Sequence, residues 1–125
     1  MADQLDIILV AFLFLNIKHF VCDFPFQSDY QVRTKRIYGH PGGIWHSGLH
    51  ALATMPVFLL LKPAFGVAFV IVAAEFVLHY HIDWVKDRVV TKYDWQPKDR
   101  SYWHAFGADQ LLHNLTYVGV VAAAI

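Results

Sequence analysis

Histidine and aspartate residues occur along this chain in pairs that share one spacing. Residues four apart lie on the same face of an α-helix, one turn above the other. Imidazole nitrogens and carboxylate oxygens are ligands of Zn²⁺, Fe²⁺ and Mn²⁺. The spacing therefore indicates metal chemistry, provided that the fold brings the pairs together. The pairs are His19 and Asp23, His46 and His50, His79 and Asp83, and Asp109 and His113.

The elements that must position these pairs are long apolar segments. A helix needs about 20 apolar residues to cross a bilayer, and we place such spans at about 5–24, 44–61, 64–85 and 104–125. Only 16% of the residues are charged, whereas soluble domains carry about 25%. The sequence predicts an all-α integral membrane four-helix bundle, formed by one domain over 1–125 and kinked at Pro56.

The order of the spans predicts that the pairs meet. Only Lys62 and Pro63 separate the second span from the third, whereas long polar loops join the other spans. The chain then crosses alternately, and all the pairs fall at the loop end. We expect a deeper layer and a layer nearer the loops, about 6 Å apart along the helices. The deeper layer holds His19, His50, His79 and His113, and the other holds Asp23, His46, Asp83 and Asp109.

An internal repeat supports this arrangement. His19 and Asp23 recur sixty residues later as His79 and Asp83. His46 and His50 recur sixty-three residues later, as Asp109 and His113. The repeat predicts two helical hairpins related by a pseudo-twofold axis along the membrane normal, with a site at their interface.

The distribution of cations predicts the orientation. Basic residues crowd the first and third loops, and the opposite face has only Lys62. By the positive-inside rule the long loops are cytoplasmic and both termini lie outside. The formal net charge is zero, so the chain lacks the basic surplus of a general nucleic-acid binder. The expected partners are membrane lipids, with a larger membrane complex or a homo-oligomer as further alternatives.

The predicted site offers more ligands than one tetrahedral ion uses. We therefore expect one or two ions, with two ions about 3.5–4 Å apart. Zn²⁺ is expected first, and Fe²⁺ and Mn²⁺ are the alternatives. His46 and Asp109 lie nearer water and are either ligands or groups that orient ligands; Asp109 is alternatively a helix cap.

Glu75 and Asp109 are the candidates for a general base. Glu75 lies one turn deeper than His79, where it either accepts a hydrogen bond from an imidazole or takes a proton. Lys18 precedes His19 but lies on another face of the predicted helix, so we expect it to extend toward the membrane surface.

The segments HFVCDFPFQSDYQVRTK (19–35), WHSGLH (45–50), LHYHIDWVKD (78–87) and DQLLH (109–113) resemble a bacterial membrane family, domain-of-unknown-function family 3307. The resemblance covers nearly the whole chain and implies the bacterial inner membrane. A looser similarity, carried by His46-Ser47 and HYHID, links the chain to membrane-bound metal-dependent hydrolases.

These observations favour a metal-dependent hydrolase that acts on an amphiphilic ester or phosphoester at the cytoplasmic leaflet. A metal-bound water would attack, and the basic loops would receive an anionic headgroup. One alternative is a metal-stapled accessory subunit, a metal transporter or a sensor. Another is a non-haem di-iron oxidase, although the Glu-x-x-His pattern of soluble di-iron bundles does not occur in the sequence.

Overall fold

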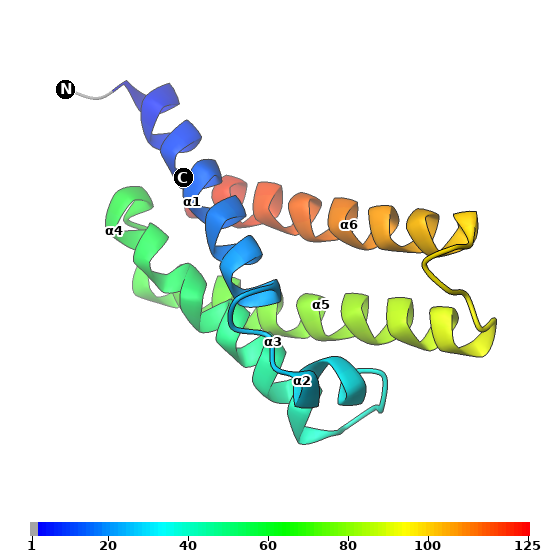
Figure 1. The fold of residues 1–125 in the computed structure, drawn as a ribbon. Coiled ribbons are helices and arrows are strands. Elements are labelled where there is room, and N and C mark those ends of the chain that lie inside the picture. The colour runs from blue at the N-terminus through cyan, green and yellow to red at the C-terminus, as the bar shows by residue number, and fades with distance from the viewer. Residues whose placement is uncertain (1–2) are drawn as a thin grey trace.

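The computed structural model describes residues 3–125, and every regular element in that range is helical (Figure 1). The elements are α1 (Gln4–Asp23), α2 (Asp29–Thr34), α3 (Pro41–Thr54), the 3₁₀ turn η1 (Met55–Val57), α4 (Phe58–Leu61), α5 (Phe65–Lys92) and α6 (Arg100–Ala124). The predicted all-α class is confirmed.

The four long helices pack in a ring. α1 contacts α3 and α6, and α5 contacts the same two helices. α5 and α6 run antiparallel along most of their length, and the start of α1, the end of α6 and α4 lie at one end (Figure 1). The two long loops, with α2 in the first of them, lie toward the other end. This arrangement directs the loop-side halves of all four helices toward one another.

Local sequence signals explain where the second long segment begins, bends and ends. Pro41 occupies the first turn of α3, and His40 Nδ1 accepts a hydrogen bond from the Gly42 backbone N–H at 3.1 Å. Pro56 lacks a backbone N–H, and the chain tightens there into η1. Lys62 has a left-handed backbone with φ of 51° and ends α4. The kink predicted at Pro56 thus coincides with a change from α-helix to 3₁₀ turn.

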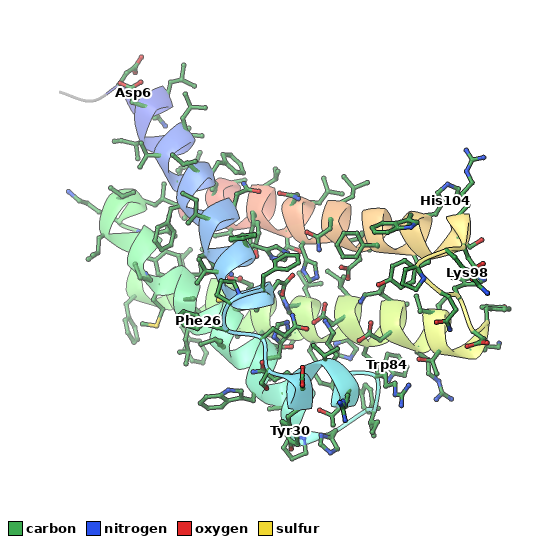
Figure 2. All side chains as sticks on the ribbon, in the orientation of Figure 1. Asp6, Phe26, Tyr30, Trp84, Lys98 and His104 are labelled. Atoms are coloured by element: carbon green, nitrogen blue, oxygen red, sulfur yellow. The ribbon has the colours of Figure 1, made fainter. Side chains whose placement is uncertain are left out.

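The helices extend beyond the predicted spans on the loop side. α5 continues to Lys92 rather than 85, and α6 begins at Arg100 rather than 104. Hydropathy marks where a segment stops being apolar, whereas a helix continues for as long as its backbone hydrogen bonds are made. Lys98 and His104 therefore lie at the tip of a projecting α5–α6 hairpin (Figure 2).

Three segments are long and apolar enough to cross a membrane, namely Gln4–Asp23, Pro41–Leu61 and Phe65–Lys92. α6 has 25 residues but is more polar, because its first half carries Arg100, His104 and Asp109. Large apolar side chains face outward, including Leu9, Leu13, Ile17 and Phe20 along α1. Such continuous apolar surface is typical of association with a membrane.

The interior divides into a polar and an apolar half. An apolar cluster fills the half near α4 and the end of α6, and it contains Ala11, Leu15, Val57, Ile71, Tyr117, Val120, Val121 and Ala124. Most of the buried histidines and carboxylates lie on the loop side of this cluster. The polar half is where the predicted site lies.

Candidate metal centre

The eight side chains that the sequence singles out converge inside the ring. Each of α1, α3, α5 and α6 supplies one pair, as the i, i+4 spacing predicts. Seven of the eight residues are buried, and His46 and His50 are 0% exposed. Asp23, the remaining member, keeps 13% of its side chain accessible. Burial of so many ionisable groups is costly unless they are paired or bind an ion.

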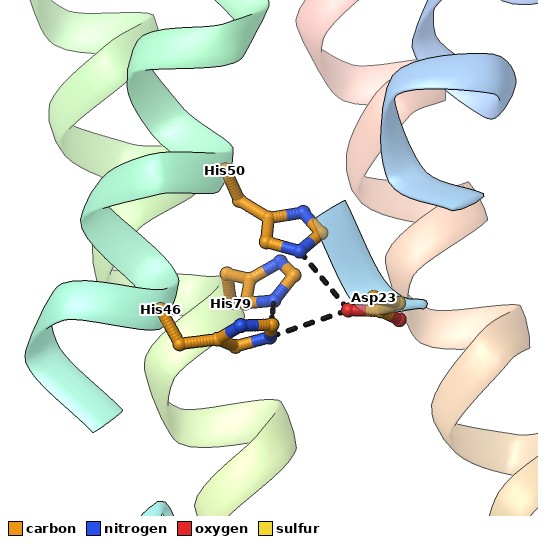
Figure 3. Close-up of side chains that lie close together, drawn as sticks. All are labelled: Asp23, His46, His50 and His79. Carbon is orange, nitrogen blue, oxygen red and sulfur yellow. Dashed lines mark hydrogen bonds and ion pairs between the residues drawn. The ribbon is translucent and has the colours of Figure 1, made fainter. Parts of the chain in front are cut away.

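Three imidazoles from α3 and α5 meet the Asp23 carboxylate of α1 (Figure 3). Asp23 Oδ1 lies 3.0 Å from His50 Nε2 and 3.2 Å from His46 Nε2. His79 Nε2 lies 3.4 Å from His46 Nε2. Figure 3 shows the three rings turned toward one side, with the carboxylate opposite them. These four residues form a compact donor set.

Asp83 occupies the corresponding position on α5. Its Oδ2 lies 3.1 Å from His46 Nε2 and 3.6 Å from His79 Nε2. Its Oδ1 lies 3.2 Å from His113 Nε2. Asp109 Oδ1 lies 3.4 Å from the same His113 nitrogen. The carboxylate of Asp83 thus faces histidines of α3 and α5 with one oxygen and a histidine of α6 with the other.

The two predicted layers meet at their donor atoms. His46 belongs to the layer near the loops and His50 to the deeper layer, yet both Nε2 atoms lie within 3.2 Å of one Asp23 oxygen. The helical rise separates the backbone positions, but the side chains tilt toward a common centre. The arrangement is a single cluster rather than two stacked sites.

His19 is held by a residue that the sequence analysis did not identify. Its Nδ1 lies 2.7 Å from the Tyr117 hydroxyl, and its Nε2 lies 3.0 Å from Asp23 Oδ2. Tyr117 is 1% exposed. A partner on one ring nitrogen fixes the orientation of the ring and directs the other nitrogen into the cluster. The spacing of Tyr117, one turn beyond His113, is a signal that the sequence already contains.

Lys18 points inward, so the expectation that it extends to the membrane surface was wrong. Lys18 Nζ lies 2.5 Å from Glu75 Oε1 and donates to the His50 carbonyl at 2.9 Å. Both side chains are at most 5% exposed. An unpaired Glu75 carboxylate inside the ring would be costly, which explains why Lys18 turns toward it. Glu75 is thus bound to a lysine, at the deep side of the cluster.

A family model described as "Protein of unknown function (DUF3307)" matches residues 8–125. The chain belongs to this family. The match covers every residue of the centre, from His19 to His113. No curated protein and no solved structure matches the chain. The findings give no support to the looser similarity to membrane-bound hydrolases.

In this DUF3307 chain, α2 places a cation over the centre. Ser28 and Gln31 form a capping box that begins α2, and the chain then turns Lys35 toward α5. Lys35 Nζ lies 3.4 Å from Asp83 Oδ2. Burial alone would lower the pKa of Lys35, but the carboxylates around it, Asp83 first among them, together outweigh burial and raise that pKa above its usual range. Lys35 therefore keeps its charge.

The centre opens toward the loops. A cavity of about 510 Å³ lies beside it, and Asp23 and Asp109 form part of its wall. Asp23 and Asp109 are thus accessible from the loop side, whereas Lys18 and Glu75 lie on the deep side. The cavity is lined on the remaining sides by residues of α2 and by the loop-side parts of α5 and α6.

Proposed function

We propose that this DUF3307 chain is a membrane-embedded, metal-dependent hydrolase that acts on an ester or a phosphoester at the loop-side face. The observation that carries the proposal is the convergence of imidazoles and carboxylates from four helices beside an open cavity. A purely structural metal site is closed by protein ligands, whereas a catalytic site leaves room for water or substrate. The cavity supplies that room.

The donor spacing fits transition ions. Ligands of a tetrahedral Zn²⁺, with bonds of about 2.0–2.1 Å, lie about 3.3–3.4 Å apart. The nitrogens of His46 and His79 are 3.4 Å apart, and His113 Nε2 lies 3.2 Å from the nearer Asp83 oxygen. Nitrogen and oxygen donors together suit Zn²⁺ first, with Fe²⁺ or Mn²⁺ as alternatives.

The two central aspartates favour a pair of ions. Asp23 presents Oδ1 to His46 and His50 but Oδ2 to His19. Asp83 presents Oδ2 to His46 and His79 but Oδ1 to His113. Asp23 and Asp83 would therefore be shared by two ligand sets. The first set is then His46, His50 and His79, and the second set is Asp109, His113 and His19.

The internal repeat supports this division. A pseudo-twofold operation that takes His19 to His79 and His46 to Asp109 also exchanges Asp23 with Asp83 and His50 with His113. It converts one proposed ligand set into the other and keeps the two shared carboxylates central. The pseudo-twofold four-helix bundle, with α6 as the fourth span, is therefore part of the proposal. We place the chain in the bacterial inner membrane, with its loops on the cytoplasmic side.

Metal ions bound there would supply a hydroxide near neutral pH and polarise the scissile group. Asp109 is the better-placed base, because it lines the cavity and would have one carboxylate oxygen left over from the second ligand set, whereas Glu75 is bound to Lys18 on the deep side. Asp109 would take the proton of the attacking water and return it to the leaving alkoxide. The water oxygen bonds to the acyl carbon or phosphorus as the bond to the leaving oxygen breaks.

The first test is the metal content of the purified protein. We expect about two transition ions per chain in the wild type, from the two ligand sets. The Asp83→Ala and His113→Ala variants should lose most of this metal. His104→Ala is the matched control, because this exposed histidine lies at the start of α6, outside the cluster. If both cluster variants keep the metal content of the wild type, Asp83 and His113 do not bind the metal, and the proposed metal centre is overturned.

The second test separates an enzyme from the alternatives. Hydrolysis of a panel of lipid and phosphate esters should stop on chelation and return when Zn²⁺ is restored. A protein that binds metal but leaves the whole panel unchanged would instead be a metal-stapled accessory subunit. Activity that requires iron and oxygen rather than zinc would identify the oxidase alternative.

A further inference from the structure

The cavity beside the centre has a basic wall. Arg33, Lys35 and Arg36 enter it from the α2 region, and Lys86 enters it from α5. Lys35 is paired with Asp83, and Lys86 with Asp87. Within residues 3–125 the two arginines form no ion pair, so their guanidinium groups are free for a ligand. Guanidinium groups bind phosphate through paired, charge-assisted hydrogen bonds.

An apolar groove runs between α5 and α6 away from this cavity. Its first part, of about 390 Å³, shares Lys86 and Asp109 with the basic cavity. Its second part, of about 530 Å³, is joined to the first through Leu78, Ile82 and Leu112. The groove then continues to Gly119 and Ala123.

The dimensions of the groove fit an alkyl chain. From Asp109 to Ala123 a helix rises about 21 Å, which exceeds the hydrocarbon depth of one leaflet, about 15 Å. The groove lies on the outer face of the α5–α6 pair, where an alkyl chain can enter from the membrane. Its loop-side end is bordered by Asp109 of the centre, and its other end lies in the far half of the bundle.

We propose that the ligand of this site is a membrane amphiphile with an anionic phosphate headgroup. The headgroup lies against Arg33 and Arg36, and a single alkyl chain lies in the α5–α6 groove. The bond between the two parts is thereby held beside Asp109. As a statement about the substrate class this rests on the proposed hydrolase function, but the binding site itself requires only the cavity and the groove.

The test measures binding rather than turnover. The full-length, detergent-purified protein is treated with EDTA and titrated with hexadecyl phosphate by native mass spectrometry. Hexadecyl phosphocholine is the matched probe, because it has the same chain and no net charge. We expect hexadecyl phosphate to bind at least about tenfold more tightly, because its phosphate monoester offers the arginines three unesterified oxygens and up to two negative charges, whereas the single phosphate charge of phosphocholine is offset by its own ammonium group. The Arg33→Gln/Arg36→Gln double variant should abolish this preference.

The groove is tested with neighbouring alanines of α5. Ala74 lines the groove, whereas Ala73 is an exposed neighbour outside it. Ala74→Phe should weaken the binding of hexadecyl phosphate at least about tenfold, because several methylene groups lose their contacts. Ala73→Phe should leave the affinity unchanged. Octyl phosphate, whose chain is shorter, should be less affected by Ala74→Phe.

Equal affinity for the two headgroups would mean that the groove holds only bulk membrane lipid, and it would overturn the proposal. Equal effects of Ala74→Phe and Ala73→Phe would do the same. Selective binding without metal content or turnover would leave this inference standing and remove the hydrolase. Turnover of a short, soluble ester without selective binding would support the hydrolase and overturn this inference.

Discussion

Asp23 and Asp83 each divide their two oxygens between different histidines, and this division organises the centre. The i, i+4 spacing was sufficient to predict that these eight side chains lie together, because helical periodicity fixes which side chains share a face. It was insufficient for Lys18, which lies about 100° around α1 from His19. In a ring of four helices the interior receives more than one stripe of each helix, so Lys18 also faces inward.

The hydroxyl of Tyr117 gives a prediction at the same scale. Tyr117→Phe removes the partner of His19 Nδ1 and leaves the ring free to rotate. Metal affinity should fall by about 10- to 100-fold, as for other partners that orient metal ligands. Competition with a chromogenic zinc chelator measures the change.

Tyr38→Phe is the control for this change. Tyr38 also contacts a histidine, since its hydroxyl lies 3.2 Å from His81 Nε2, but this pair lies outside the centre. Its removal should leave metal affinity unchanged. If both variants bind metal like the wild type, Tyr117 does not position His19.

At the scale of elements, α2 was the feature that the sequence analysis missed. Six residues are too few for a hydrophobic period to emerge, and the stability of such a helix comes from its contacts. Ser28 and Gln31 nevertheless carry the spacing of a capping box, which is a local signal of a helix start. The loop between the first two spans is therefore an ordered cover that brings Lys35 to Asp83.

Close approach of α3 to this cover depends on Gly43. A Cβ atom at Gly43 would lie 3.3 Å from Lys35 Cα and 3.3 Å from Tyr80 Cε2. Gly43→Ala should therefore displace the backbone at Lys35 and lower the melting temperature in detergent, although alanine favours the helix by about 1 kcal/mol.

Gly48→Ala is the matched substitution in the same helix. Its Cβ would meet only Phe76 Cε2, at the ordinary contact distance of 3.9 Å. The helix-propensity gain should then appear as an unchanged or higher melting temperature. Equal melting temperatures for the two variants would show that the contact between α3 and the α2 region contributes little.

For the whole molecule, hydropathy predicted the order of the long helices, but it did not predict their ends. Phe65 is 90% exposed while Glu75 is 1% exposed. Apolar side chains of α5 thus face outward and polar ones inward, the reverse of a helix on the surface of a protein in water. This inversion follows from composition. The length of the α5–α6 hairpin does not, because the charged residues up to Lys92 and from Arg100 form helix as readily as apolar ones.

The topology can be measured with cysteine labelling. The chain has a single cysteine, the buried Cys22, which is replaced by serine to give a silent background. Lys62 and Lys98 are both exposed and belong to opposite ends of the bundle. In intact bacterial cells, a membrane-impermeant maleimide should react with the Lys62→Cys variant at once.

The Lys98→Cys variant should react only after the cells are permeabilised, because the third loop is predicted to be cytoplasmic. Reaction of both variants from the same side would contradict a helix order in which the chain crosses between them. Reaction of Lys98→Cys alone in intact cells would reverse the proposed orientation.

The Lys18–Glu75 pair and the apolar cluster around Leu15 and Val121 together close the deep side of the centre. An ion that arrived from the loops would have to abandon its ligands and enter a packed hydrocarbon interior in order to go further, which is prohibitively costly. If the proposed ions bind there, we expect them to enter and leave the centre only from the loop side. This closed deep side fits the proposed hydrolase, whose substrate and product would use one opening, better than it fits transport of metal ions across a membrane.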